Sequence, residues 1–170
     1  MDERRRRFEQ LVLPHLGAAY NLARWLGGRD AEDVAQDAIL RAFRAFDGFR
    51  GGDAKAWLFT IVRNCHYTAL GRRRKTVALP DEGENDIASD APDPEVSAID
   101  ADRARKLNRV IASLPDEFRE ALVLREMEDM SYREIGEITG VPIGTVMSRL
   151  SRARALLRQS WQAQTKETAP

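Results

Sequence analysis

The stretch Ser131–Arg158 constrains this chain most, because its residues predict a helix-turn-helix. The first helix carries Ile135 and Ile138 on its inner face, and Gly140 is suited to end it, since glycine adopts a positive φ at little cost. Pro142 cannot continue a helix but suits the start of the next one. A short helix, a marked turn and a basic second helix together predict a reader of the DNA major groove.

The second helix of this pair separates apolar from polar positions. Its inner face repeats at helical spacing and comprises Val146, Leu150, Ala153 and Leu157. At about 100° per residue, the opposite face holds the side chains best placed for base edges, which are Ser148, Ser151 and Arg152. Phosphate contacts, which fix register without reading sequence, suit Arg149, Arg154 and Arg158. The alternative is a solvated basic helix in an ordinary bundle.

The net charge of zero conceals an uneven distribution along the chain. Residues 1–75 hold 15 Lys and Arg against 9 Asp and Glu, whereas residues 76–98 hold 7 acids and no Lys or Arg. Residues 99–170 are almost balanced, with 12 basic and 11 acidic side chains. Because phosphate neutralisation supplies most non-specific affinity, the last segment is too weakly basic to suggest tight DNA binding alone.

Composition and periodicity indicate an all-α protein of two small helical domains. At 170 residues the chain suits one larger domain or two small ones, and no useful β alternation is present. We expect helices over residues 8–26, 31–46 and 54–74, with Asp30 capping the second, and over residues 99–114 and 116–127 before the helix-turn-helix. The domain boundaries expected are 1–75, a flexible acidic linker at 76–98, 99–164, and a tail at 165–170.

The cellular setting expected from the sequence is the cytoplasm. No apolar run is long enough to span a membrane, so no membrane insertion is expected, and the N-terminus lacks the apolar core of a signal peptide. The single cysteine, Cys65, excludes an internal disulfide. Neither Cys65 nor the histidines His15 and His66 have the spacing of a zinc site or of an acid–base pair, so we expect no metal, no cofactor and no catalysis.

Three features of residues 1–75 allow two interpretations each. Leu40 lies among polar residues opposite the apolar face of its helix. It is either a lone exposed leucine, which is common on protein surfaces, or the apolar centre of a protein-binding patch. Trp57 suits the core better than a base-stacking platform. The run at residues 72–75 is either a solvated helix end or a phosphate contact, and the second DNA reader in the chain favours phosphate contact.

Three blocks of the sequence resemble the extracytoplasmic-function (group IV) sigma factors of bacterial RNA polymerase, within the sigma-70 family. These blocks are DAEDVAQDAILRAF, FDGFRGGDAKAWLFTIVRN and LPDEFREALVLREMEDMSYREIGEITGVPIGTVMSRLSRAR. The resemblance covers roughly residues 8–160 and includes the order of both domains. It implies a promoter-specificity subunit with a sigma region 2 domain at 1–75 and a sigma region 4 domain at 99–164.

The resemblance also implies a role for particular residues. The helix at 31–46 would bind the clamp helices of core RNA polymerase through Asp33, Gln36, Asp37, Leu40 and Arg41. The minus-ten element would be melted and captured by residues that match that role, with Asn64 suited to a base edge: Arg50, Lys55, Asn64, Thr68, Arg72, Arg73 and Arg74. The minus-thirty-five element would be read as duplex by Arg133, Thr145, Met147, Ser148, Arg149, Ser151, Arg152 and Arg154. Met147 and Ser151 depart from the residues common in relatives.

The expected partners are core RNA polymerase, promoter DNA and an anti-sigma factor, in a stress or envelope response. The acidic linker would thread toward the RNA exit path. The alternative is an autonomous helix-turn-helix repressor or activator, which requires a self-association face and symmetric half-sites. The flexible linker and the polar patch around Leu40 fit a large partner better.

Overall fold

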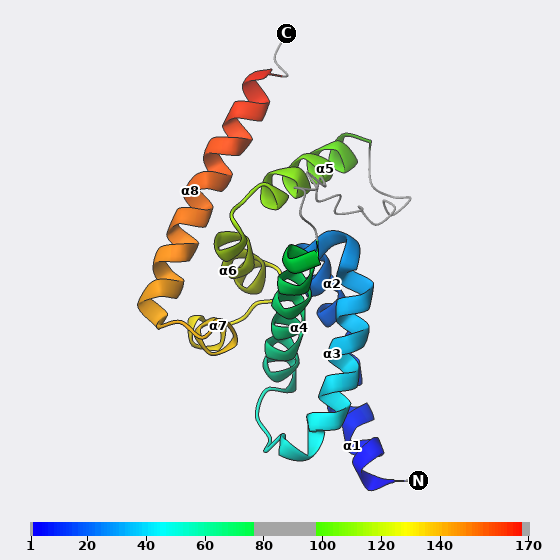
Figure 1. The fold of residues 1–170 in the computed structure, drawn as a ribbon. Coiled ribbons are helices and arrows are strands. Elements are labelled where there is room, and N and C mark those ends of the chain that lie inside the picture. The colour runs from blue at the N-terminus through cyan, green and yellow to red at the C-terminus, as the bar shows by residue number, and fades with distance from the viewer. Residues whose placement is uncertain (1, 77–97, 168–170) are drawn as a thin grey trace.

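The structure, a computed structural model, describes residues 2–76 and 98–167 (Figure 1). These residues form helices and turns with no strand among them, which confirms the all-α prediction. The helices are α1 (Glu3–Leu11), α2 (Leu16–Gly27), α3 (Ala31–Ala45), α4 (Ala54–Thr76), α5 (Ala98–Ala112), α6 (Asp116–Glu126), α7 (Tyr132–Thr139) and α8 (Ile143–Glu167). The linker expected at 76–98 lies almost entirely outside the described residues, as does the end of the tail at 165–170.

Two local expectations about the first helices were wrong. The stretch 8–26 is not one helix, because a short 3-10 turn at Leu13–His15 separates α1 from α2. Pro14 lies inside that turn, where its missing N–H and fixed φ disfavour a continuous helix. Asp30 makes no capping hydrogen bond to α3, and its carboxylate instead accepts one from Arg73 at 2.8 Å.

Helices α2, α3 and α4 pack together and form the N-terminal unit with α1 (Figure 1). Leu22, Leu58, Phe59 and Val62 are fully buried between them. Burying such side chains contributes roughly 1.5–3 kcal/mol each. The approach of α2 to α4 depends on Gly27, because a Cβ atom there would lie 2.8 Å from the ring of His66.

Helices α5–α8 form the C-terminal unit, in which α6 and α7 both pack against α8. Its buried residues include Val123, Leu124, Ile135, Val146 and Leu150. The two units are in contact, since α4 packs against α7 and α2 packs against α6. In Figure 1, α6 and α7 lie between α4 and the long helix α8.

Among the described residues, no helix is both long enough and apolar enough to cross a membrane.

Candidate nucleic-acid interface

The predicted helix-turn-helix is present as α7 and α8, and its local chemistry explains both ends of α7. Ser131 and Glu134 form a reciprocal capping box, in which the Ser131 Oγ accepts from the Glu134 backbone N–H at 3.1 Å. The Glu134 carboxylate accepts from the Ser131 backbone N–H at 2.7 Å. Gly140 then ends α7 in the left-handed conformation, with φ of 72°, as the sequence predicted.

Helix α8 presents the predicted reading face to solvent. Its apolar face is buried at Val146, Leu150 and Ala153, as predicted, although Leu157 is only partly buried. The expected base-edge residues are all exposed, as is Met147, and they are Ser148, Ser151 and Arg152. Thr145, at the start of the helix, is half-buried.

Three other cations expected at the minus-thirty-five site are paired with acids. Arg149 is 18% exposed and lies 3.7 Å from Glu117 on α6. Arg154 donates to Glu126 at 2.7 Å, and Arg133 donates to Glu137 on its own helix at 3.2 Å. Surface pairs such as those of Arg154 and Arg133 contribute little to stability, so these two guanidinium groups can exchange a carboxylate for a phosphate at small cost.

The loop between α3 and α4 is anchored by aromatic side chains that pack against one another. The Phe49 ring lies 5.0 Å from the Trp57 ring and 5.9 Å from the Phe46 ring, measured between centroids. Trp57 is therefore a partly buried core residue, as its spacing favoured. The Asp53 carboxylate caps α4 by accepting from the backbone N–H groups of Lys55 and Ala56.

This anchored loop lines one side of an open cavity of about 700 Å³. Arg50 and Trp57 contribute to the N-terminal side of the cavity, while Arg133 and Glu137 of α7 contribute to the other side. The cavity thus joins a residue expected at the minus-ten site to one expected at the minus-thirty-five site.

The remaining minus-ten candidates extend along α4. Asn64 and Thr68 are exposed one helical turn apart, and the Thr68 hydroxyl donates to the Asn64 carbonyl at 2.8 Å. Arg72, Arg73 and Arg74 are exposed at the C-terminal end of α4, where cations interact favourably with the helix dipole.

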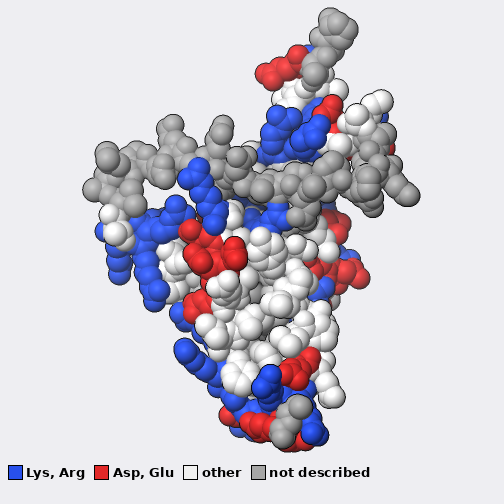
Figure 2. Space-filling model, turned by 90° about the vertical axis from the view of Figure 1, so that its right-hand side faces the viewer, with Lys and Arg blue, Asp and Glu red and all other residues white. Residues whose placement is uncertain are grey.

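The outer face of α3 carries the residues expected to bind polymerase. Leu40 is 56% exposed, so it is a surface residue and not part of the core. Around it, Asp37 accepts from Arg41 at 2.9 Å, and this hydrogen bond lowers the pKa of Asp37. Asp33 and Gln36 are also exposed. Figure 2 views the molecule from the α1–α3 side and shows acidic and basic side chains beside a broad uncharged surface.

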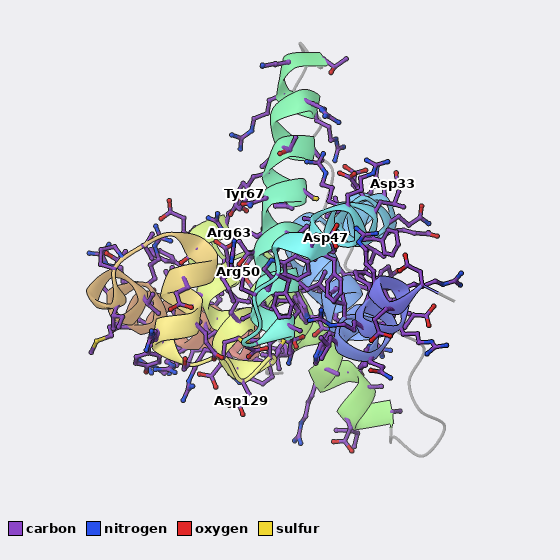
Figure 3. All side chains as sticks on the ribbon, turned by 90° about the horizontal axis from the view of Figure 1, so that it is seen from below. Asp33, Asp47, Arg50, Arg63, Tyr67 and Asp129 are labelled. Atoms are coloured by element: carbon purple, nitrogen blue, oxygen red, sulfur yellow. The ribbon has the colours of Figure 1, made fainter. Side chains whose placement is uncertain are left out.

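A second set of contacts, which the sequence analysis missed, joins α4 to the C-terminal unit. Arg63 donates to Glu120 of α6 at 2.5 Å, and the Tyr67 hydroxyl donates to the other oxygen of that carboxylate at 3.4 Å. Lys55 lies 3.1 Å from the Glu128 carboxylate. Figure 3 shows Arg63 and Tyr67 on the side of α4 nearer the C-terminal helices, with Asp33 on the opposite side. No local pattern pairs residues so far apart in sequence.

Burial gives the ionisable groups at this contact unusual properties. Glu120 is 1% exposed, and burial raises its pKa despite the nearby Arg63. Burial also raises the pKa of Tyr67 to about 12. His66, which lies beside a cavity of about 120 Å³ between the units, has a pKa lowered by burial. Its sequence neighbour Cys65 is buried, and burial raises the pKa of its thiol to about 11.

Comparison with known sequence families identifies both units. The Sigma-70 region 2 family matches residues 11–76, and the Sigma-70, region 4 family matches residues 104–157. The first of these ranges includes the α3 patch and all of α4, and the second includes α7 and residues 143–157 of α8.

Individual proteins and solved structures give the same result. The ECF RNA polymerase sigma factor SigE of Mycolicibacterium smegmatis is 37% identical over 95% of this chain, which spans 64% of that protein's length. The ECF RNA polymerase sigma-E factor of Haemophilus influenzae is 35% identical over 83% of this chain and 79% of its own length. A solved structure of the sigma factor RpoE with the anti-sigma factor NepR from Bartonella quintana matches 91% of this chain and 96% of that one, with a TM-score of 0.77 and 30% identity.

Proposed function

This chain belongs to the extracytoplasmic-function RNA polymerase sigma factors, and we propose that it binds core RNA polymerase and directs promoter-specific transcription initiation. The observation that carries this proposal is that one chain holds both an exposed helix-turn-helix, α7 and α8, and a separate basic helix, α4. The region 2 match contains all of α4, and the region 4 match contains α7 and α8 as far as residue 157. An autonomous repressor needs only the first of these.

We infer a division of labour between the two units. Residues 1–75 bind polymerase and melt and capture the minus-ten element, and residues 99–164 read the minus-thirty-five element as duplex. The exposure of Arg152 and its serine neighbours on α8 supports base contact there. The exposure of Asn64 supports contact with an unstacked base, since a carboxamide can both donate to and accept from a base edge.

The exposed side chain of Leu40 supports polymerase binding by α3. An apolar centre ringed by charged groups has the composition of a protein interface, in which the centre excludes water and the rim sets specificity. Asp37 and Arg41 pair with each other on this face, so the rim offers both a positive and a negative group beside Leu40.

The partners we propose are core polymerase, promoter DNA and an anti-sigma factor, and the working compartment is the cytoplasm, where polymerase acts. Anti-sigma control is supported by the RpoE and NepR complex among the similar structures. No catalytic role is proposed, because the buried Cys65 thiol stays protonated near neutral pH, and the thiolate is the reactive form.

Binding to core polymerase tests this function, with Leu40→Asp as the decisive variant. Placing a charge at the apolar centre should weaken association at least about tenfold, or about 1.4 kcal/mol. Co-elution of labelled chain with core polymerase measures this, and circular dichroism reports whether the helices persist.

Leu13→Asp is the matched control, because Leu13 is 39% exposed but lies in the turn before α2. We expect this control to bind polymerase as the unchanged chain does. If the unchanged chain ignores core polymerase yet binds a palindromic duplex by itself, the proposed function is wrong.

A further inference from the structure

Helix α1 begins with a run of arginines, and one of them, Arg4, lies against the C-terminal end of α3. Its guanidinium group donates to the backbone carbonyl oxygen of Phe43 at 2.5 Å and to that of Arg44 at 3.5 Å. Both carbonyls belong to the last turn of α3, where carbonyl groups lack the regular partner of an α-helix. Arg4 therefore supplies donors to a helix end from outside that helix.

The same side chain also holds the turn that follows α3. The Arg4 Nε donates to the Asp47 carboxylate at 2.8 Å, and Asp47 lies in the 3-10 turn Phe46–Gly48 that leads into the loop before α4. The guanidinium carbon lies 4.5 Å from the centre of the Phe43 ring. A guanidinium group can make these contacts together because its donors form a planar fork with apolar faces. One side chain thus joins the end of α3 to the turn after it.

Phe8 adds an apolar contact at the same place, because it lies one helical turn after Arg4 on the same face of α1. Its ring is buried and meets the rings of Phe43 and Phe46 edge to face, with centroids 5.1 and 5.3 Å apart. Phe46 packs in turn against Phe49 of the loop. Helix α1 therefore extends the aromatic packing that anchors this loop, and in Figure 1 it lies at the same end of the N-terminal unit as the loop.

The loop depends on anchors at its two ends. It exposes Arg50 beside the open cavity, and Gly51 and Gly52 follow with φ of 92° and 96°. Two successive glycines give the backbone little conformational preference of its own. The place of Arg50 is therefore set on one side by the capped start of α4 and on the other by the turn that Arg4 holds.

Resting on the proposed function, we propose that Arg4 is a positioning residue for recognition of the minus-ten element. Its side chain is 29% exposed and is occupied by α3 and the turn, so it acts through the loop and not by contact with DNA. It fixes where α3 ends and where the loop with Arg50 begins, so that the loop meets the captured base in one orientation. Arg4 precedes the region 2 match, which begins at residue 11.

Arg4→Ala in the reconstituted holoenzyme tests this proposal. Arg5→Ala is the matched control, because it removes the same charge at the next position, where the side chain is 65% exposed and pairs with Glu9 of its own helix. A promoter is first selected from a random DNA library with the unchanged holoenzyme. Initiation is then measured on that promoter and on versions with one base of the minus-ten or the minus-thirty-five element changed.

We expect Arg4→Ala to lower the preference for the selected minus-ten base by roughly fivefold or more, the lower end of what one base contact supplies. The preference at the minus-thirty-five element should not change. A loss of stability alone would lower the active fraction equally on every promoter, so it would leave both preferences unchanged. A minus-ten preference that is the same in Arg4→Ala and Arg5→Ala would overturn the proposal.

Trypsin cleavage after Arg50 in the free chain reports the loop directly. Cleavage there should be at least about twofold faster in Arg4→Ala than in Arg5→Ala, as expected when a net hydrogen bond that holds the loop is lost. Cleavage after Arg119, which is buried, reports global unfolding and should stay the same. If cleavage after Arg119 also rises, Arg4→Lys replaces Arg4→Ala in the promoter comparison, since it keeps the charge but loses the fork of donors.

The outcomes separate this proposal from the proposed function. If the unchanged chain with core polymerase selects no promoter, the proposed function is wrong. If the unchanged chain initiates and a folded Arg4 variant keeps the full minus-ten preference, Arg4 only attaches α1 to α3.

Discussion

Arg152 and Arg149 are both arginines of α8, but their surroundings differ. Arg152 is exposed and makes no ion pair within the described residues, whereas Arg149 is 18% exposed and lies near Glu117. Their angular positions on α8 account for this difference. At about 100° per residue, Arg149 lies about 70° from the centre of the buried face of Val146, Leu150 and Ala153, whereas Arg152 lies about 130° from it. A free guanidinium group on the outer face can contact a base without first leaving a carboxylate.

Arg152→Ala should therefore weaken promoter binding by the holoenzyme by about 1–3 kcal/mol if the side chain reads a base. Competition between a cognate promoter and one with an altered minus-thirty-five element measures this loss. Ser151→Ala is a control for truncation on the same face. An equal loss on both promoters would assign Arg152 to a phosphate instead.

Among the elements, α7 is the first helix of the helix-turn-helix and packs against the reading helix, α8. It shows how local chemistry stabilises a short supporting helix. It has only eight residues, which is too short for a stable isolated helix. Its capping box, the glycine after its last turn and its packing against both α8 and α4 compensate for this length. Pro14 has the opposite effect, since it divides an apolar pattern that would otherwise be continuous.

Ser131→Ala should lower the free energy of unfolding by about 1 kcal/mol, because the Glu134 backbone N–H loses its side-chain acceptor. Urea unfolding followed by circular dichroism measures the change. Ser160→Ala, inside α8, provides a control expected to stay within about 0.5 kcal/mol of the unchanged chain. Equal effects of the two substitutions would mean that the capping box does not stabilise α7.

At the scale of the whole molecule, the contact between the two units places ionisable groups away from water. His66 faces charged groups from both units, which are Asp30, Arg63, Asp116 and Arg119. Its pKa is lowered by burial, so the folded chain favours the neutral imidazole. Burial raises the pKa of Glu120, so the folded chain favours the protonated, neutral carboxyl at that position. Protonation of Glu120 therefore favours the folded state, whereas protonation of His66 disfavours it.

The pH dependence of stability follows from His66. A lowered pKa in the folded state gives stability that is present above the ordinary pKa of about 6.5 and is lost as the pH falls through the folded value. Between pH 7.5 and 5.5, the unfolding free energy should therefore fall more steeply for the unchanged chain than for His66→Gln. The contribution of Glu120 is common to both and cancels. Parallel curves from urea unfolding would contradict this assignment.

Much of the fold was determined by sequence alone. The spacing of apolar residues predicted α3, α4, α5 and α6 to within a few residues at each end. The last helix, α8, is longer than the predicted helix-turn-helix, because it continues past Arg158 to Glu167. Gly140 and Pro142 marked the turn, because glycine and proline act on the backbone of their own positions. The exposure of Leu40 also followed from its place opposite the apolar face.

Only the tertiary structure decided which cations are paired with acids on other helices. Arg63 and Glu120 are 57 residues apart, so helical periodicity within either segment carries no information about their meeting. The same holds for Lys55 with Glu128 and for the burial of His66 against Gly27. Local sequence determines the faces of each helix, because backbone sterics and side-chain spacing act over a few residues. The choice of which faces meet depends on packing between distant segments, and that choice placed Glu120 of α6 against Arg63 of α4.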